Sequence, residues 1–145
     1  MLDQKEFYET IVDIHFEYFN IDLISNKRIL EKIKNFTKLA KISFSKNNLH
    51  SFYQIIKFED LGEINNIIIK NNDICSSNLL KYFLLYRFQN LKYFNNEEIG
   101  QKDILIAKKL FEYFDKCISM NENRNREVYQ SLINNIIINI LGINN

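Results

Sequence analysis

The sequence predicts an all-α protein: a compact bundle of about six helices around a central apolar helix over residues 77–94. Proline is absent and only three glycines occur, which suits a chain made mainly of helices. Apolar residues recur at the spacing of one helix face along most of the chain. The length of 145 residues is that of an ordinary domain, so we expect a single helical domain over residues 1–145.

The stretch 77–94 is apolar on almost every side, which predicts that neighbouring helices enclose it. Its broadest apolar face contains Leu80, Phe83, Leu84, Phe88, Leu91 and Phe94. Arg87 is the exception, because its helical direction falls in the middle of that face. Two interpretations are open: the guanidinium reaches solvent or a carboxylate while its stem packs, or it lines a pocket and receives an acidic ligand or partner group.

Helical segments are also expected before the central helix. Asp3 and Glu6 have the spacing of a capping box, so the first helix is placed at residues 3–20. The second and third helices are placed at about residues 26–42 and 45–58 from their apolar periodicity. A short helix should follow Asp60, although the isoleucines at 67–69 also suit a strand, an alternative that we rank lower.

After the central segment, a long helix is expected at residues 97–120, with a core stripe of Ile104, Ala107, Phe111, Phe114 and Ile118. Residues 120–126 are the most polar stretch of the chain and predict a surface turn. A last helix is expected at residues 126–141, where Gly142 provides a natural stop.

Charge is balanced overall but divided along the chain. The formal net charge is +1, so no global field attracts nucleic acid or an anionic membrane. Residues 1–26 contain six acidic residues and one basic residue, whereas residues 27–46 contain seven basic residues and one acidic residue. The first two helices are therefore expected to carry complementary acidic and basic faces.

These faces provide the candidate binding residues. On the acidic side they are Glu9, Asp13 and Glu17, and on the basic side Lys34, Lys38 and Lys41, with Arg87 as a separate candidate. The lysine face is open to three interpretations: a solvated surface, a partner for the first helix, or a patch for phosphate or an acidic protein. Nucleic-acid binding by the basic segment 27–57, with Phe44 and Tyr53 as stacking groups, is the alternative function.

Enzymatic chemistry is not expected. Nucleophile elbows, phosphate-binding loops and dinucleotide fingerprints need glycines at fixed spacings, and the three scattered glycines build none of them. The two histidines and two cysteines, His15, His50, Cys75 and Cys117, lack the short spacing of a metal site. We therefore expect no catalytic residues, metal or cofactor, and reduced thiols.

Two short sequences occur twice. INNIII begins at residues 64 and 133, and FEYF begins at residues 16 and 111, so the offsets are 69 and 95 residues. Because the offsets differ, we attribute both pairs to biased composition and not to an internal repeat. The abundance of Asn, Ile and Lys, whose codons are AT-rich, indicates an AT-rich genome.

The function favoured by the sequence is stoichiometric binding to another protein, as in an inhibitor, an immunity or anti-defence protein, or an adaptor subunit. High aromatic content and separate charged faces support this expectation. A homodimer is compatible with it, and nucleic acid is the less favoured partner. No apolar run is long enough to span a membrane and the N-terminus has no signal-peptide pattern, so we expect a cytoplasmic location, in the producing cell or a host cell.

Overall fold

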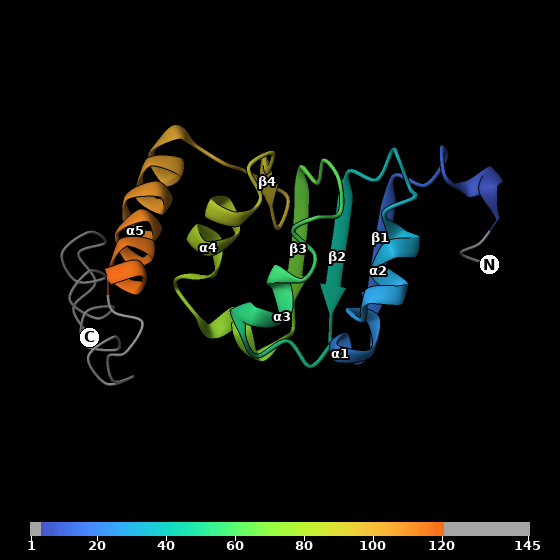
Figure 1. The fold of residues 1–145 in the computed structure, drawn as a ribbon, viewed down its shortest axis with the longest axis horizontal. Helices are drawn as coiled ribbons and strands as arrows, with labels where there is room; N and C mark the ends of the chain where they lie inside the picture. Colours follow the sequence, from blue (N-terminus) through green and yellow to red (C-terminus); the bar gives the residue numbers. More distant parts are fainter. Residues whose placement is uncertain (1–3, 121–145) are drawn as a thin grey trace. The chain divides into compact units, whose positions relative to one another are not determined.

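The computed structural model, which describes residues 4–120 and the side chains of residues 4–112, has an α/β fold. The strands form a five-stranded sheet in the order β1-β2-β3-β4-β5, so neighbours in the sheet are also neighbours along the chain (Figure 1). Strands β1 to β4 pair in parallel, and β5 pairs with β4 in the antiparallel sense. The prediction of an all-α helical bundle is therefore wrong.

The strands recur at a nearly constant interval. Their bounds are Asp13–Glu17 for β1, Lys41–Ser45 for β2, Asn66–Lys70 for β3, Tyr93–Phe94 for β4 and Glu97–Glu98 for β5. The first four strands start at residues 13, 41, 66 and 93, so successive starts are 28, 25 and 27 residues apart. In the sheet register, Asp13, Lys41, Asn66 and Tyr93 stand side by side.

Short helices connect the parallel strands, and one long helix follows the sheet. The helices are η1 (Lys5–Phe7), α1 (Ile21–Ile24), α2 (Lys27–Ile33), α3 (Phe52–Ile56), η2 (Asp73–Ser76), α4 (Leu80–Arg87) and α5 (Gln101–Met120), of which η1 and η2 are 3-10 helices. Asparagine side chains begin two of them: Asn20 accepts from the Asp22 backbone N–H, and Asn26 accepts from that of Ile29.

Each strand with its following connection forms one repeat unit, and equivalent positions in the units carry equivalent residues. The inward strand positions are Ile14 and Phe16 in β1, Ile42 and Phe44 in β2, and Ile67 and Ile69 in β3. A buried apolar residue precedes three of the strands by the same interval, as Leu39, Ile64 and Leu91. Tyr18, Lys46 and Asn71 follow directly after β1, β2 and β3, and all three have positive φ angles of 59°, 52° and 54°.

The inward strand residues build the core between adjacent units. The side chains of Ile42, Phe44, Ile67 and Ile69 are each 1% exposed. The Phe44 ring is stacked on that of Phe16 at 5.6 Å and meets Phe58, from the loop after α3, edge-on at 5.0 Å. Apolar burial between neighbouring units therefore holds the sheet together, as in solenoid proteins whose repeats cannot bury their apolar faces alone.

Asn72, just after β3, supplies polar bonds to that core. Its side-chain oxygen accepts from the backbone N–H groups of Asn47 and Leu49, at 2.9 and 3.4 Å. Its amide donates to the carbonyl oxygens of Phe44 and Lys70, at 3.3 and 2.8 Å. Asn47 holds the equivalent position one unit earlier, and its amide donates to the carbonyl of Phe19 at 3.0 Å. Asn72 and Asn47 thus tie the ends of β3 and β2, respectively, to the unit before each.

The sheet corrects several expected helices. Residues 3–20 contain η1 and strand β1; the second helix ends at Ile33 and is followed by β2; and only residues 52–56 of the third are helical. Residues 66–70 form strand β3, the alternative that was ranked lower. The expected central helix is helical only over residues 80–87 and is followed by strand β4. An apolar run of only a few residues suits a helix and a strand equally well. Here the pairing of these runs with neighbouring strands decides their secondary structure.

The long helix expected at residues 97–120 is observed as α5 over residues 101–120, because residues 97–98 pair with β4 as strand β5. Helix α5 lies in a second compact part of the chain. Within the described residues, residues 4–99 form one compact part and residues 100–120 belong to another. Within α5, Ala107 and Phe111 are buried as predicted, whereas Ile104 is 39% exposed. The side chains of Phe114 and Ile118, the turn at 121–126 and the helix expected at 126–141 lie outside the described residues.

Candidate functional site

The outward-facing strand positions form the broadest array of polar side chains in the sheet. Alternate residues of a strand point to opposite faces, so the positions between the inward residues project away from the core. We call this surface the open face, and it consists of Asp13, His15, Glu17, Lys41, Ser43, Ser45, Asn66, Ile68, Lys70 and Tyr93. Ser43, in the middle of β2, is only 3% exposed, whereas the other side chains are half-buried or exposed. These side chains come from four strands that the repeat holds at fixed spacing, which makes the open face a pre-organised surface.

The β1 side of the open face is charged and internally paired. Lys41 contacts Asp13 at 3.1 Å, and Lys46 contacts Glu17 at 3.2 Å. The side chains of Asp13 and Glu17 remain 43% and 44% exposed. Such exposed pairs add little stability, but they fix the positions of charges on the surface.

Lys46 also contacts Tyr18, at the end of β1. Its ammonium group donates to the Tyr18 hydroxyl at 2.7 Å and lies 4.7 Å from the centre of that ring. The hydrogen bond to Tyr18 and, next, that to Glu17 favour the charged form and raise the pKa of Lys46. A fixed cation beside an aromatic ring that is 72% exposed therefore marks this end of the open face.

The β3 and β4 side of the open face differs in character. Ile68 is half-buried, Lys70 is exposed and the Tyr93 side chain is 40% exposed. An aliphatic residue and an accessible tyrosine on neighbouring strands of one face are groups that protein interfaces often use. This side therefore offers apolar contact, and the β1 side offers fixed charges.

The structure separates the predicted basic residues. Lys34 is the cap residue after α2 and contacts Glu31 at 3.5 Å, Lys38 is exposed in the loop before β2, and Lys41 is half-buried on β2. The single lysine face on one helix is therefore wrong, because the helix ends before Lys34. Lys41 pairs with an acidic residue from the first segment of the chain, but across two strands and not between two helices.

The predicted acidic residues are divided in a similar way. Asp13 and Glu17 lie on β1 at alternate positions, so both point out from the open face. Glu9 is exposed in the turn before the strand. His15 stands between the two acids, at the exposed centre of β1.

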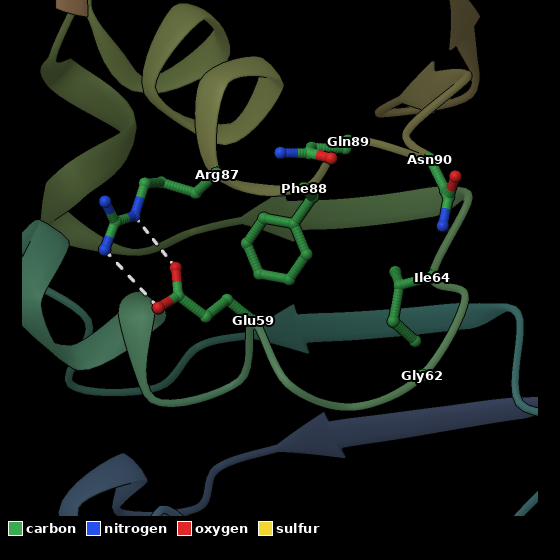
Figure 2. Close-up of a pocket in the computed structure, with 7 residues that line it drawn as sticks. All are labelled: Glu59, Gly62, Ile64, Arg87, Phe88, Gln89 and Asn90. Atoms are coloured by element: carbon green, nitrogen blue, oxygen red, sulfur yellow. Dashed lines mark hydrogen bonds and ion pairs between the residues drawn. The ribbon is translucent and has the colours of Figure 1, made fainter.

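Arg87 lies apart from the open face, at the last residue of α4. Its Nε donates to Glu59 Oε2 at 2.8 Å and its Nη2 donates to Glu59 Oε1 at 3.4 Å. The pair borders a hollow of about 180 Å³ that is also lined by Gly62, Ile64, Phe88, Gln89 and Asn90 (Figure 2). Of the two interpretations of Arg87, the contact with a carboxylate is the arrangement observed, and a role in ligand binding stays a prediction.

The part of the chain whose side chains the structure describes contains both histidines and Cys75. No group of three or more His, Cys, Asp or Glu side chains there is placed to hold a metal ion. His15 lies on β1, while the His50 ring contacts the Asn48 carbonyl at 2.9 Å in the loop after β2. Cys75 is an exposed free thiol. No helix within residues 4–120 has both the length and the apolar character required to cross a membrane.

Sequence reasoning missed the outward residues Ser43, Ser45, Asn66, Ile68, Lys70 and Tyr93, because the repeat itself was missed. The signal was present as the pattern Ile-x-Phe-x-x-Asn-x-Leu at residues 42–49 and Ile-x-Ile-x-x-Asn-x-Ile at residues 67–74. Together with Leu39 and Ile64, these segments match the pattern of leucine-rich repeats, whose strands line one face of a solenoid. The intervals of 28, 25 and 27 residues fall within the range of that repeat.

Comparison with known structures agrees with this fold. A chain in the crystal structure of the Drosophila melanogaster SNF/U2A' complex matches with a TM-score of 0.50 and 20% sequence identity, over 54% of this chain and 45% of that chain. The matched region thus covers about half of each protein, and the likeness concerns the fold alone. No family model and no curated protein matches the sequence.

Proposed function

We propose that the chain is a stoichiometric protein-binding module that binds its partner with the open face of the sheet. The observation that carries this proposal is the combination of Ile68 and Tyr93 with the fixed charge pairs of β1 and β2 on one surface. Rigid strands present these groups, so little conformational entropy is lost on binding. An inhibitor, an immunity or anti-defence protein and an adaptor subunit would all use such a surface.

The fold comparison supports a protein partner only by analogy. The matched structure is that of a protein in a complex, and its fold is similar over about half of this chain. Function on a shared fold depends on the site, so the argument rests on the residues of the open face. Parallel strands at a fixed spacing place equivalent side chains of successive units in rows across the sheet. Such an extended surface suits a broad partner surface better than a small ligand.

Co-purification from the native host followed by mass spectrometry would identify the partner. Substituting Tyr93→Ala is then expected to weaken binding at least tenfold, because accessible tyrosines often contribute strongly to binding at protein interfaces. The matched control is Tyr53→Ala, since Tyr53 is 69% exposed but lies on α3 and not on the open face. Calorimetric titration of both variants checks the prediction. Loss of binding with Tyr53→Ala alone would place the partner elsewhere.

Nucleic-acid binding by residues 27–57 can be distinguished from protein binding by how strongly the affinity depends on salt concentration. Phe44, one of the two expected stacking groups, is 1% exposed in the core and is therefore not accessible to a base. We expect only weak binding of single-stranded RNA or DNA at physiological salt, as measured by fluorescence anisotropy. Tight binding that falls steeply with salt, and that is abolished when Lys34, Lys38 and Lys41 are changed to Glu, would favour nucleic acid over protein.

A further inference from the structure

Strand β1 stands at one end of the sheet, and its outer backbone edge is unpaired within the described residues. On its inner side, the Lys41 N–H donates to the Val12 carbonyl at 3.1 Å and the Tyr18 N–H donates to the Ser45 carbonyl at 3.2 Å. Alternate residues of a strand direct their N–H and C=O groups to opposite sides. The backbone groups of Asp13, His15 and Glu17 therefore point away from β2.

The same edge leaves its apolar residues incompletely covered. Ile14 and Phe16 of β1 are half-buried, whereas their counterparts in β2 and β3 are almost fully buried. The flanking side chains of Val12 and Phe19 are 56% and 55% exposed. In a repeat array each unit covers the apolar residues of the next unit. Strand β1 covers those of β2, but no described strand covers those of β1.

We infer that this edge binds an extended segment of a partner protein as an added β-strand. The segment would carry basic side chains opposite Asp13 and Glu17, whose carboxylates remain accessible, and apolar side chains opposite Ile14 and Phe16. Main-chain hydrogen bonds to residues 13, 15 and 17 would supply affinity, and the alternating pattern would supply specificity. The edge site goes beyond the open-face proposal, which is tested at Tyr93 on β4, three strands away on the same face.

Charge favours a different protein over a second copy of this chain. Antiparallel pairing of two β1 strands through their outward backbone groups would be centred on His15. Asp13 of one copy would then lie opposite Glu17 of the other. Like charges in directly opposed positions destabilise a strand pair, whereas lysine or arginine in the same positions stabilises it.

The probe for this site is a synthetic peptide of about nine residues with alternating Lys and Val, and its control carries Glu in place of Lys. Titration of the isotope-labelled full chain, followed by NMR, should show saturable shifts at residues 12–18. The Glu peptide should bind at least tenfold more weakly, because two favourable cross-strand charge pairs become two repulsive ones.

Two variants test the backbone and charge contributions separately. His15→Pro removes an N–H that points outward, a substitution that edge strands accept, and should weaken the Lys peptide at least tenfold. Asp13→Asn with Glu17→Gln should reduce the preference for the Lys peptide over the Glu peptide by a similar factor. Asp60→Asn with Glu63→Gln is the matched control, because both acids are exposed away from β1. Thermal melts of each variant verify that the chain is folded.

Several results would overturn the inference. One is no binding of the Lys peptide at millimolar concentration, and another is equal binding of the Lys and Glu peptides. Shifts confined to residues outside β1 would also contradict it. A dimer in sedimentation that is lost in His15→Pro would assign the edge to a second copy and refute the heterologous partner.

Discussion

Replacing Asn72 with alanine is expected to lower the free energy of unfolding by about 3 kcal/mol. The Asn72 side chain is bonded to backbone groups of Phe44, Asn47, Leu49 and Lys70. The residue is only 8% exposed, so water does not replace these bonds when the side chain is truncated. Urea unfolding followed by circular dichroism measures the loss.

The matched control is Asn78→Ala, because Asn78 is an exposed asparagine before α4. It should leave the free energy of unfolding within about 0.5 kcal/mol of the parent chain. Asn72→Asp keeps an acceptor for the Asn47 N–H but replaces the amide donor with a second carboxylate oxygen beside the Phe44 and Lys70 carbonyls, so it too should destabilise. A loss from Asn72→Ala no larger than that of the control would refute the structural role of Asn72.

The apolar periodicity of the sequence predicted buried positions better than it predicted their secondary structure. Leu80, Phe83, Leu84, Phe88 and Leu91 were expected in the core and are buried. Helix and strand were confused where an apolar pattern extended over only a few residues, as at β1. Ile14 and Phe16 there satisfy a period of two, but the surrounding residues also satisfy a period near 3.6, and only pairing with β2 decides.

The repeat is not visible as a recurrence of identical letters. The INNIII segment at residue 64 spans the start of one unit, since Ile64 precedes β3 and Ile67 and Ile69 are its inward residues. The second INNIII segment lies outside the described residues. Comparing INNIII with FEYF gave unequal offsets, because FEYF at residue 16 falls at a different position of its unit. A search for the pattern of apolar and asparagine positions, at intervals of 25–28 residues, would have found the units.

The candidate site was predictable only in part for a related reason. Charge patterning selected Asp13, Glu17 and Lys41, and all three lie on the open face. It also selected Lys34 and Lys38, which lie off the sheet, because a helix was assumed to carry all three lysines. Ile68 and Tyr93 carry no charge signal, and only the strand register brings them to one surface with the charged residues.

Arg87→Ala is expected to cost about 2 kcal/mol of the free energy of unfolding, because it removes two charge-assisted hydrogen bonds and leaves the Glu59 carboxylate without its partner. The two side chains are 30% and 29% exposed, so water partly compensates Glu59 and the cost stays below that of a fully buried pair. Arg87→Met should cost less, since it keeps the volume and apolar character of the stem.

A double-mutant cycle separates the ion pair from the packing of the stem. If the ion pair stabilises the fold, Arg87→Met should lower the free energy of unfolding much less in the Glu59→Gln background than in the parent chain. The coupling free energy from thermal or urea unfolding should then be about 1 kcal/mol. If Arg87 instead serves the adjoining hollow as a binding residue, both substitutions at Arg87 should leave unfolding unchanged and weaken partner binding together. Unchanged unfolding with unchanged binding would show that the contact with Glu59 contributes neither to stability nor to recognition, because solvent would then replace the carboxylate at no cost.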